Sequence, residues 1–169
     1  IRMTSLMNVN DMLEQMSKKL GILLKQRKID NPVMIGIHTG GVWIAEKLHE
    51  MLNIDEELGK LGISFYRDDF SKIGLHPEVK ASSLPFDVEN RDIILVDDVL
   101  FSGRTVRAAL NEIFDFGRPS SVILTILLDR GSRELPIQPD IVGQRIRLNP
   151  KEHIKLSGPE PLALSVHDE

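Results

Sequence analysis

The chain has 169 residues, of which 41% are hydrophobic, and these values predict a single domain with a sizeable core. A net charge of −4 gives no overall electrostatic attraction to nucleic acid, although a local basic face remains compatible with it. The chain has no cysteine, which excludes disulfides, zinc fingers and thiol nucleophiles, and no apolar run of the roughly 20 residues of a membrane span, so we expect a cytoplasmic protein without a membrane partner.

The first half of the chain predicts two helices around a buried strand. The segment VMIGI at 33–37 is short, apolar and preceded by the breaker Asn31-Pro32, which is typical of a fully buried strand. An amphipathic helix is expected before it, after Asn10 as N-cap, with apolar residues at Met12, Leu13, Met16, Leu20, Leu23 and Leu24. The turn HTGG leads into a second helix, with one apolar face formed by Ile44, Ala45, Leu48, Met51 and Leu52.

The middle of the chain predicts a strand and a long connection. LGISFY at 61–66 has the residue types of a strand. The polar stretch 67–90 that follows is interrupted by Gly and Pro. A connection of this length inside a compact domain is usually a functional lid or disordered.

The second half begins with the best-defined unit, which is the strand DIILV at 92–96, the loop DDVLFSG and a helix. The apolar stripe of that helix holds Val106, Ala109, Leu110 and Ile113, and the helix is closed by Gly117 and Pro119. A strand at 121–128, a short strand at 140–146 and an edge hairpin through HIKL complete the prediction. Continuous apolar strands that alternate with helices indicate an α/β fold with a mostly parallel sheet covered on both faces.

Two adjacent acids, Asp97 and Asp98, follow the strand at 92–96. In open α/β sheets, ligands bind beyond the carboxyl ends of the strands, where these acids fall. The turn Ser102 to Thr105 begins a helix, so its free N–H groups, hydroxyls and glycine suit a phosphate. The alternative is that the acids only end a strand and cap the next element, but two in a row before this turn favour a site.

The segment also resembles the magnesium-binding strand of nucleoside triphosphatases, but the chain lacks the GxxxxGK[ST] loop that this interpretation requires, and it lacks GxGxxG. The order of strand, acids, loop and helix resembles the phosphoribosyl pyrophosphate (PRPP) signature of type I phosphoribosyltransferases. The resemblance implies that fold for 3–169, with a flexible flap at about 64–90 and a small base-binding hood at about 129–150. It also implies that the acids face the ribose while the loop takes the 5′-phosphate, so carboxylates and anion contact different ends of one ligand.

Several blocks extend the match across most of the chain: IGIHTGGVWIA, FYRDD, VDDVLFSGRTVRAAL, FDFGRPSSV and LLDRGSRELPIQPDIVG. They resemble the PyrR family, which comprises pyrimidine operon attenuation regulators and uracil phosphoribosyltransferases. The resemblance implies a homodimer or homotetramer that converts uracil and PRPP into UMP and pyrophosphate. It also implies a regulator that, loaded with UMP or UTP, binds the leader mRNA of a pyrimidine operon.

The resemblance assigns roles to residues of this sequence. Asp97, Asp98 and Arg67 are implied as catalytic, with Mg²⁺ held mainly by PRPP instead of by a protein metal cluster. The remaining assignments are the phosphate residues Phe101, Ser102, Gly103, Arg104 and Thr105, the pyrophosphate residues His38, Thr39, Gly40 and Gly41, and the base residues Asp129, Arg130, Ile141 and Val142.

Alternatives remain open at several positions. HTGG also suits an ordinary glycine turn, and Ile141 and Val142 also suit plain core positions. Attenuators of this family typically carry Arg where this chain has Gly40 and His where it has Ser132, so an enzyme without regulation, or a regulator without the enzyme, stays in view. Basic residues that could form an RNA-binding face are Arg27, Arg118, Arg133 and Arg145. PDIVG resembles a strand of purine phosphoribosyltransferases, which keeps a purine substrate as a third hypothesis.

Overall fold

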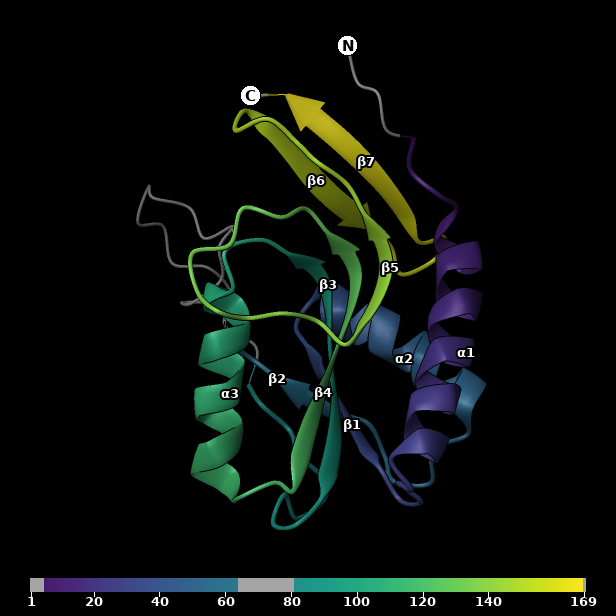
Figure 1. Cartoon of the computed structure of the whole chain (residues 1–169), viewed down its shortest axis with the longest axis vertical. Helices are drawn as coiled ribbons and strands as arrows, with labels where there is room; N and C mark the ends of the chain where they lie inside the picture. The colour runs from purple at the N-terminus through teal and green to yellow at the C-terminus, as the bar shows by residue number, and fades with distance from the viewer. Residues whose placement is uncertain (1–4, 64–80, 169) are drawn as a thin grey trace.

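A computed structural model describes residues 5–63 and 81–168 of the chain. The five strands of the main sheet are all parallel and lie in the order β2-β1-β3-β4-β5, and two further strands pair antiparallel in a separate sheet (Figure 1). In chain order the elements are α1 (Val9–Gln26), β1 (Val33–Ile37), α2 (Gly40–Leu52), β2 (Gly59–Leu61), β3 (Asp92–Leu100), α3 (Arg104–Phe116), β4 (Ser121–Asp129), β5 (Ile141–Arg145), β6 (Glu152–Ser157) and β7 (Ala163–Asp168).

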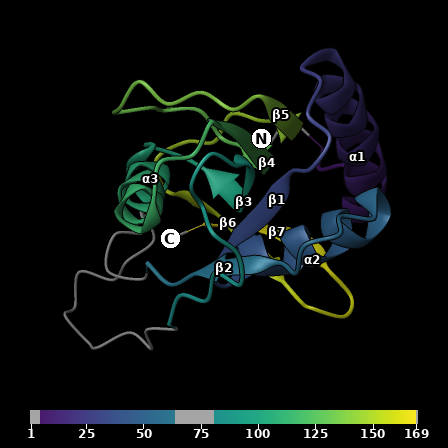
Figure 2. The same cartoon turned by 90° about the horizontal axis from the view of Figure 1, so that it is seen from below.

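Helices cover both faces of the main sheet, as the α/β prediction required. Figures 1 and 2 show α1 and α2 on one face and α3 on the other. Each face has its own apolar cluster, one that contains Met12, Ile44 and Ile94 and another that contains Ile35 and Ile113. Because side chains alternate between the faces of a strand, a strand that is covered on both sides becomes continuously apolar.

Two details of the helices differ from the prediction. The N-cap of α1 is Asn8 and not Asn10, because the Asn8 side chain accepts the Asn10 N–H at 2.9 Å and the Asp11 N–H at 3.3 Å. In α2, the predicted apolar face is buried at Ile44 but not at Met51, which is 43% exposed. The last turn of that helix therefore extends beyond the core.

Strand boundaries also differ. The predicted strand 61–66 overlaps β2 only at Leu61, since the Gly62 N–H donates to the Ser82 hydroxyl at 3.0 Å instead of to a neighbouring strand; residues 64–66 lie outside the described residues. β3, in contrast, continues beyond the predicted end at residue 96 and stays in register with β4 as far as Leu100. The two acids are thus part of a strand and not of a loop.

The predicted flap at 64–90 includes residues that are packed on the body of the domain. Ser83 forms a two-way backbone bridge with Lys60, with N···O distances of 2.7 and 2.8 Å. Val88 is 1% exposed and lies in the apolar cluster under α3. The part of the predicted flap from 64 to 80, with Arg67, lies outside the described residues.

The C-terminal hairpin of β6 and β7 lies near the carboxyl ends of β3, β4 and β5 (Figure 1). The sequence predicted a hairpin at the edge of the main sheet, but β6 and β7 pair only with each other. Leu156 anchors the hairpin in the cluster next to α1, and an ion pair of 2.8 Å joins Lys47 of α2 to Glu160 in its turn. None of the helices in the described ranges is long and apolar enough to cross a bilayer.

Candidate active site

Three predicted site segments follow neighbouring strands at one edge of the sheet. β1 leads into 38–41, β3 carries the acids and leads into 101–105, and β4 ends at Asp129. Because β3 lies between β1 and β4, the acids and the phosphate loop lie between the predicted pyrophosphate loop and the predicted base segment. This order matches a ligand whose ribose has a leaving group on one side and a base on the other.

The two acids are held by the backbone of their own strand. Asp97 is 1% exposed, and its Oδ1 accepts the Asp98 N–H at 2.9 Å. Asp98 is half-buried, and its Oδ1 accepts the Val99 N–H at 2.9 Å. These short local bonds restrict both side chains, so the carboxylates are oriented before any ligand binds.

The loop 38–41 packs directly against the acids through its two glycines. A Cβ on Gly40 would overlap the Asp98 carboxylate, and a Cβ on Gly41 would lie 3.0 Å from Asp97 Oδ1. The His38–Thr39 peptide bond is cis. The backbone of β3 therefore requires glycine at Gly41, while a side chain at Gly40 would require the Asp98 carboxylate to shift, which adds a packing reason to the turn that the sequence suggested.

Within the predicted phosphate loop, Gly103 has a left-handed backbone with φ of 98° and is the N-cap residue of α3. The Ser102 hydroxyl accepts the Arg104 N–H at 3.2 Å, and both Ser102 and Thr105 are buried. The Arg104 side chain donates to Glu134 at 2.9 Å, so in this structure its guanidinium is held at the side of the loop. The remaining backbone N–H groups at the start of α3 are suited to an anion.

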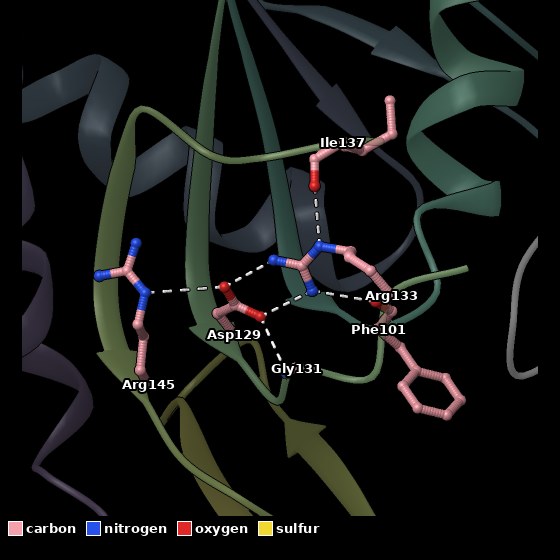
Figure 3. A network of polar contacts seen from close by, with 6 residues as sticks. All are labelled: Phe101, Asp129, Gly131, Arg133, Ile137 and Arg145. Atoms are coloured by element: carbon pink, nitrogen blue, oxygen red, sulfur yellow. Dashed lines mark hydrogen bonds and ion pairs between the residues drawn. The ribbon is translucent and has the colours of Figure 1, made fainter. Parts of the chain in front are cut away.

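Arg133 links the phosphate loop to the end of β4 (Figure 3). It donates to both carboxylate oxygens of Asp129, at 2.9 and 2.7 Å, to the Phe101 carbonyl at 3.0 Å and to the Ile137 carbonyl at 2.8 Å. One guanidinium thus joins the end of β4 and the segment after it to Phe101, which lies 32 residues earlier in the chain. The sequence placed Arg133 among the residues of a possible RNA-binding face, but its side chain is turned inward.

Asp129 is 5% exposed, and burial by itself raises the pKa of its carboxyl group. Hydrogen bonds from Arg133 and from the Gly131 N–H, with the positive charges of Arg133 and Arg145, outweigh burial, so the pKa of Asp129 lies below its ordinary value. The carboxylate therefore remains ionised at neutral pH and holds the Arg133 network together.

A cavity of about 330 Å³ opens beside this network, lined by Asp129, Gly131, Arg145, Ile146 and Arg147. It lies between the ends of β4 and β5, within the segment predicted as the hood. Ile146 and Arg147 were not predicted as site residues, and Arg145 was considered only for RNA. The alternation of charged and apolar residues in QRIR could have indicated them, because residues two apart at the end of a strand face the same side.

The other predicted base residues are less directly placed. Arg130 lies next to the cavity-lining residues in sequence, and its guanidinium stacks on the Phe101 ring at 4.2 Å. Ile141 is buried in the cluster next to α1, so packing alone accounts for it, and Val142 is also buried. Base-binding roles for Ile141 and Val142 stay predictions.

Comparisons with known proteins agree with this geometry. A phosphoribosyl transferase domain model matches residues 3–159. A bifunctional protein PyrR from Pseudomonas syringae pv. tomato is 57% identical over 97% of this chain and 96% of its own length, and one from Nitrosococcus oceani is 52% identical over 95% and 92%. The chain belongs to the PyrR family of phosphoribosyl transferases. The family predicted from the sequence blocks is thereby confirmed.

Solved structures support the fold of this PyrR family member. A hypoxanthine-guanine phosphoribosyltransferase from Bacillus anthracis superposes with a TM-score of 0.68 at 20% identity, over 91% of this chain and 88% of that one. A hypoxanthine phosphoribosyltransferase from Staphylococcus aureus gives 0.65 at 22% identity, over 86% and 78%. The predicted type I phosphoribosyltransferase fold is confirmed, while identities this low carry no information about the substrate.

Proposed function

We propose that the protein transfers the phosphoribosyl group of PRPP to uracil, giving UMP and pyrophosphate. The observation that carries the proposal is the position of Asp97 and Asp98, between a glycine loop that touches them and a phosphate loop at the start of α3. Family membership supports it, since the relatives are bifunctional PyrR proteins.

In the proposed mechanism the chain acts by orientation and by charge. The α3 N-terminus and the Ser102 and Thr105 hydroxyls bind the 5′-phosphate, and the loop 38–41 binds pyrophosphate with its backbone. Asp97 takes the ribose hydroxyls, and Asp98 lies nearest the reacting carbon. When pyrophosphate leaves, positive charge develops on the sugar, and a carboxylate that is already oriented stabilises it without reorganisation.

Mg²⁺ fits this site as a partner of the substrate. In 5–63 and 81–168 no group of three or more His, Cys, Asp or Glu side chains could hold a metal. Two adjacent carboxylates suit an ion that takes its other ligands from water, pyrophosphate and ribose oxygens, which is how Mg²⁺ usually binds with phosphates. Asp97 and Asp98 would contact it, and the ion would neutralise charge on the leaving group.

Arg67 remains the proposed cation for the pyrophosphate. Its positive charge is needed because this chain has the uncharged Gly40 where attenuators of the family carry Arg. We place the reaction in the cytoplasm and expect a homodimer or homotetramer. These statements rest on the family resemblance, because Arg67 and any partner subunit lie outside the described residues.

One assay tests the substrate. Uracil, hypoxanthine and guanine are supplied side by side as radiolabelled bases with PRPP and Mg²⁺, and nucleotide formation is followed. The proposal expects UMP as the main product. Faster formation of IMP or GMP would replace it with the purine hypothesis.

A second function, binding of a pyrimidine leader transcript in response to UMP or UTP, is supported by the word bifunctional in the names of the relatives. Three of the four basic residues considered for RNA form ion pairs within the protein: Arg133 and Arg145 with Asp129, the latter at 3.8 Å, and Arg27 with Asp140 at 3.5 Å. Regulation thus has weaker support here than catalysis.

Gel shifts with the leader transcript, with and without UMP at two salt concentrations, test the regulatory function. RNA binding that neutralises several phosphates weakens steeply as salt increases. A UMP-dependent shift that is lost at high salt supports the second function. If no shift appears under any condition, the protein is an enzyme without the regulatory function.

A further inference from the structure

The cavity between β4 and β5 has an excess of positive charge. The residues that line it include one acid, Asp129, and two arginines, Arg145 and Arg147. Asp129 is already bound through both oxygens by Arg133, which is outside the lining, and Arg145 Nε lies further away, 3.8 Å from Asp129 Oδ2. The lining therefore suits a ligand with negative charge.

The two arginines flank an apolar residue whose backbone is fixed. Ile146 lies between them in sequence, is buried, and its N–H donates to the Asp129 carbonyl at 3.0 Å. This bond fixes the backbone of 145–147 against the end of β4. Arg145 keeps a 64% exposed side chain next to the Asp129 network (Figure 3), so it can turn toward a ligand while Asp129 keeps both of its hydrogen bonds from Arg133.

The position of the cavity indicates which ligand group it meets. It lies on the β4 and β5 side of the acids, opposite the loop 38–41 on the β1 side. If the ribose lies on Asp97 and Asp98, as in the proposed function on which this inference rests, the base is the group that reaches the cavity. The volume of about 330 Å³ lies within the range of small-molecule sites.

Uracil is neutral in solution, but the nitrogen that attacks the sugar still carries a proton. In the transfer, the N1–H bond breaks and the proton passes to water, the N1 electron pair forms the bond to C1′, and the C1′–O bond to pyrophosphate breaks with its electrons leaving on oxygen. The base that has lost its proton carries a negative charge, which resonance distributes onto O2 and O4.

We propose that Arg145 and Arg147 bind the carbonyl oxygens of uracil and stabilise the anionic form of the base as the nucleophile. Guanidinium groups donate charge-assisted hydrogen bonds, which are stronger to an anion than to a neutral carbonyl. Because this stabilisation grows as charge develops on the base, it lowers the free energy of the transition state more than that of the bound substrate, and it therefore accelerates the reaction. The arginines are thus catalytic residues of the proposed transfer.

The test compares Arg145→Gln and Arg147→Gln with the wild-type protein, using uracil and the more acidic 5-fluorouracil from about pH 6 to pH 9. Arg118→Gln serves as the control, because it removes the same charge from an exposed position between α3 and β4. For uracil near pH 7, we expect each cavity variant to lose about tenfold in kcat/KM, less than the loss for a buried oxyanion donor because these side chains reach solvent. KM for PRPP should not change.

One further result separates charge stabilisation from simple contact. The loss should be smaller for 5-fluorouracil, because its anion is a weaker base and carries less charge on the carbonyl oxygens for the arginines to stabilise. Equal losses for both bases at every pH would overturn the inference, as would variants that match the wild type. If the wild-type protein makes no UMP, the proposed function fails instead.

Discussion

The two sides of the carboxyl edge of the sheet hold their groups in different ways. On the β1 and β3 side, glycines, acids and helix N–H groups come from two continuous segments, 38–41 and 97–105, and the two glycines approach the acids closely. On the β4 and β5 side, the Arg133 guanidinium joins the Asp129 carboxylate to the Phe101 carbonyl (Figure 3). The first side depends on local geometry and the second on one long-range network.

This difference separates two kinds of sensitivity. On the first side, activity should depend on the charge of two carboxylates and on the close approach of loop and strand, which leaves no room for an added atom. On the second side, stability should depend on a single guanidinium, so the network fails when that arginine is removed. The following predictions test the contrast, from the largest expected effect to the smallest.

The acids should dominate turnover on the phosphate side. Replacing Asp97 and Asp98 together by Asn should reduce UMP formation by at least about hundredfold while the fold persists, because Asn keeps the shape but not the charge. Circular dichroism and the melting temperature check the fold. Asp98→Asn alone, at the half-buried position, should already lose most of the activity, and Asp115→Asn on the exposed side of α3 is the control. Unchanged turnover in the double variant would refute the assignment.

Arg133 should dominate stability on the base side. Arg133→Gln leaves the buried Asp129 carboxylate without its two strongest donors, so we expect a loss of about 2 to 3 kcal/mol in the free energy of unfolding. Urea titration measures it. Lys47→Gln breaks the exposed ion pair with Glu160 and should lower the free energy of unfolding far less, because solvent screens such a pair. Equal effects of the two variants would contradict the network.

Gly40→Ala should act on catalysis with little effect on stability. Its Cβ overlaps the Asp98 carboxylate, which must turn away, and we expect kcat to fall by about tenfold. The matched control is Gly21→Ala in α1, where an added Cβ meets no atom within 4 Å. That control should leave activity unchanged and raise stability by about 0.5 to 1 kcal/mol. A Gly40→Ala variant with normal kcat would show that Asp98 is not oriented by this contact.

Acid should weaken the base side first. Because the folded-state pKa of Asp129 lies below its unfolded value, the Asp129–Arg133 pair stabilises the fold fully above that unfolded value, and the contribution is lost as pH falls through the folded value. When unfolding is measured from about pH 6 to pH 3, the free energy of unfolding should decrease less in Asp129→Asn than in the wild type. Parallel profiles would place the acid sensitivity elsewhere.

The same contrast explains what the sequence could reveal. The residues of the phosphate side are contiguous in sequence, so Asp97, Asp98 and the turn 102–105 could be identified from residue order. The parallel sheet could be predicted from its apolar strands. The roles of Arg133 and Arg147 could not. Arg133 reaches the Phe101 carbonyl, 32 residues away, only because β3 and β4 lie side by side, and Arg147 shares a cavity with Asp129 only because β4 and β5 pair. The predicted N-cap Asn10 was wrong by two residues, since Asn8 suits a cap equally well and local sequence does not distinguish them.

A structure of the protein with UMP tests the central claim most directly. The account predicts the phosphate at Ser102 to Thr105, the ribose against Asp97 and Asp98, and the uracil ring in the cavity beside Arg145 and Arg147. A nucleotide bound elsewhere, or a ribose that does not contact the two acids, would contradict it.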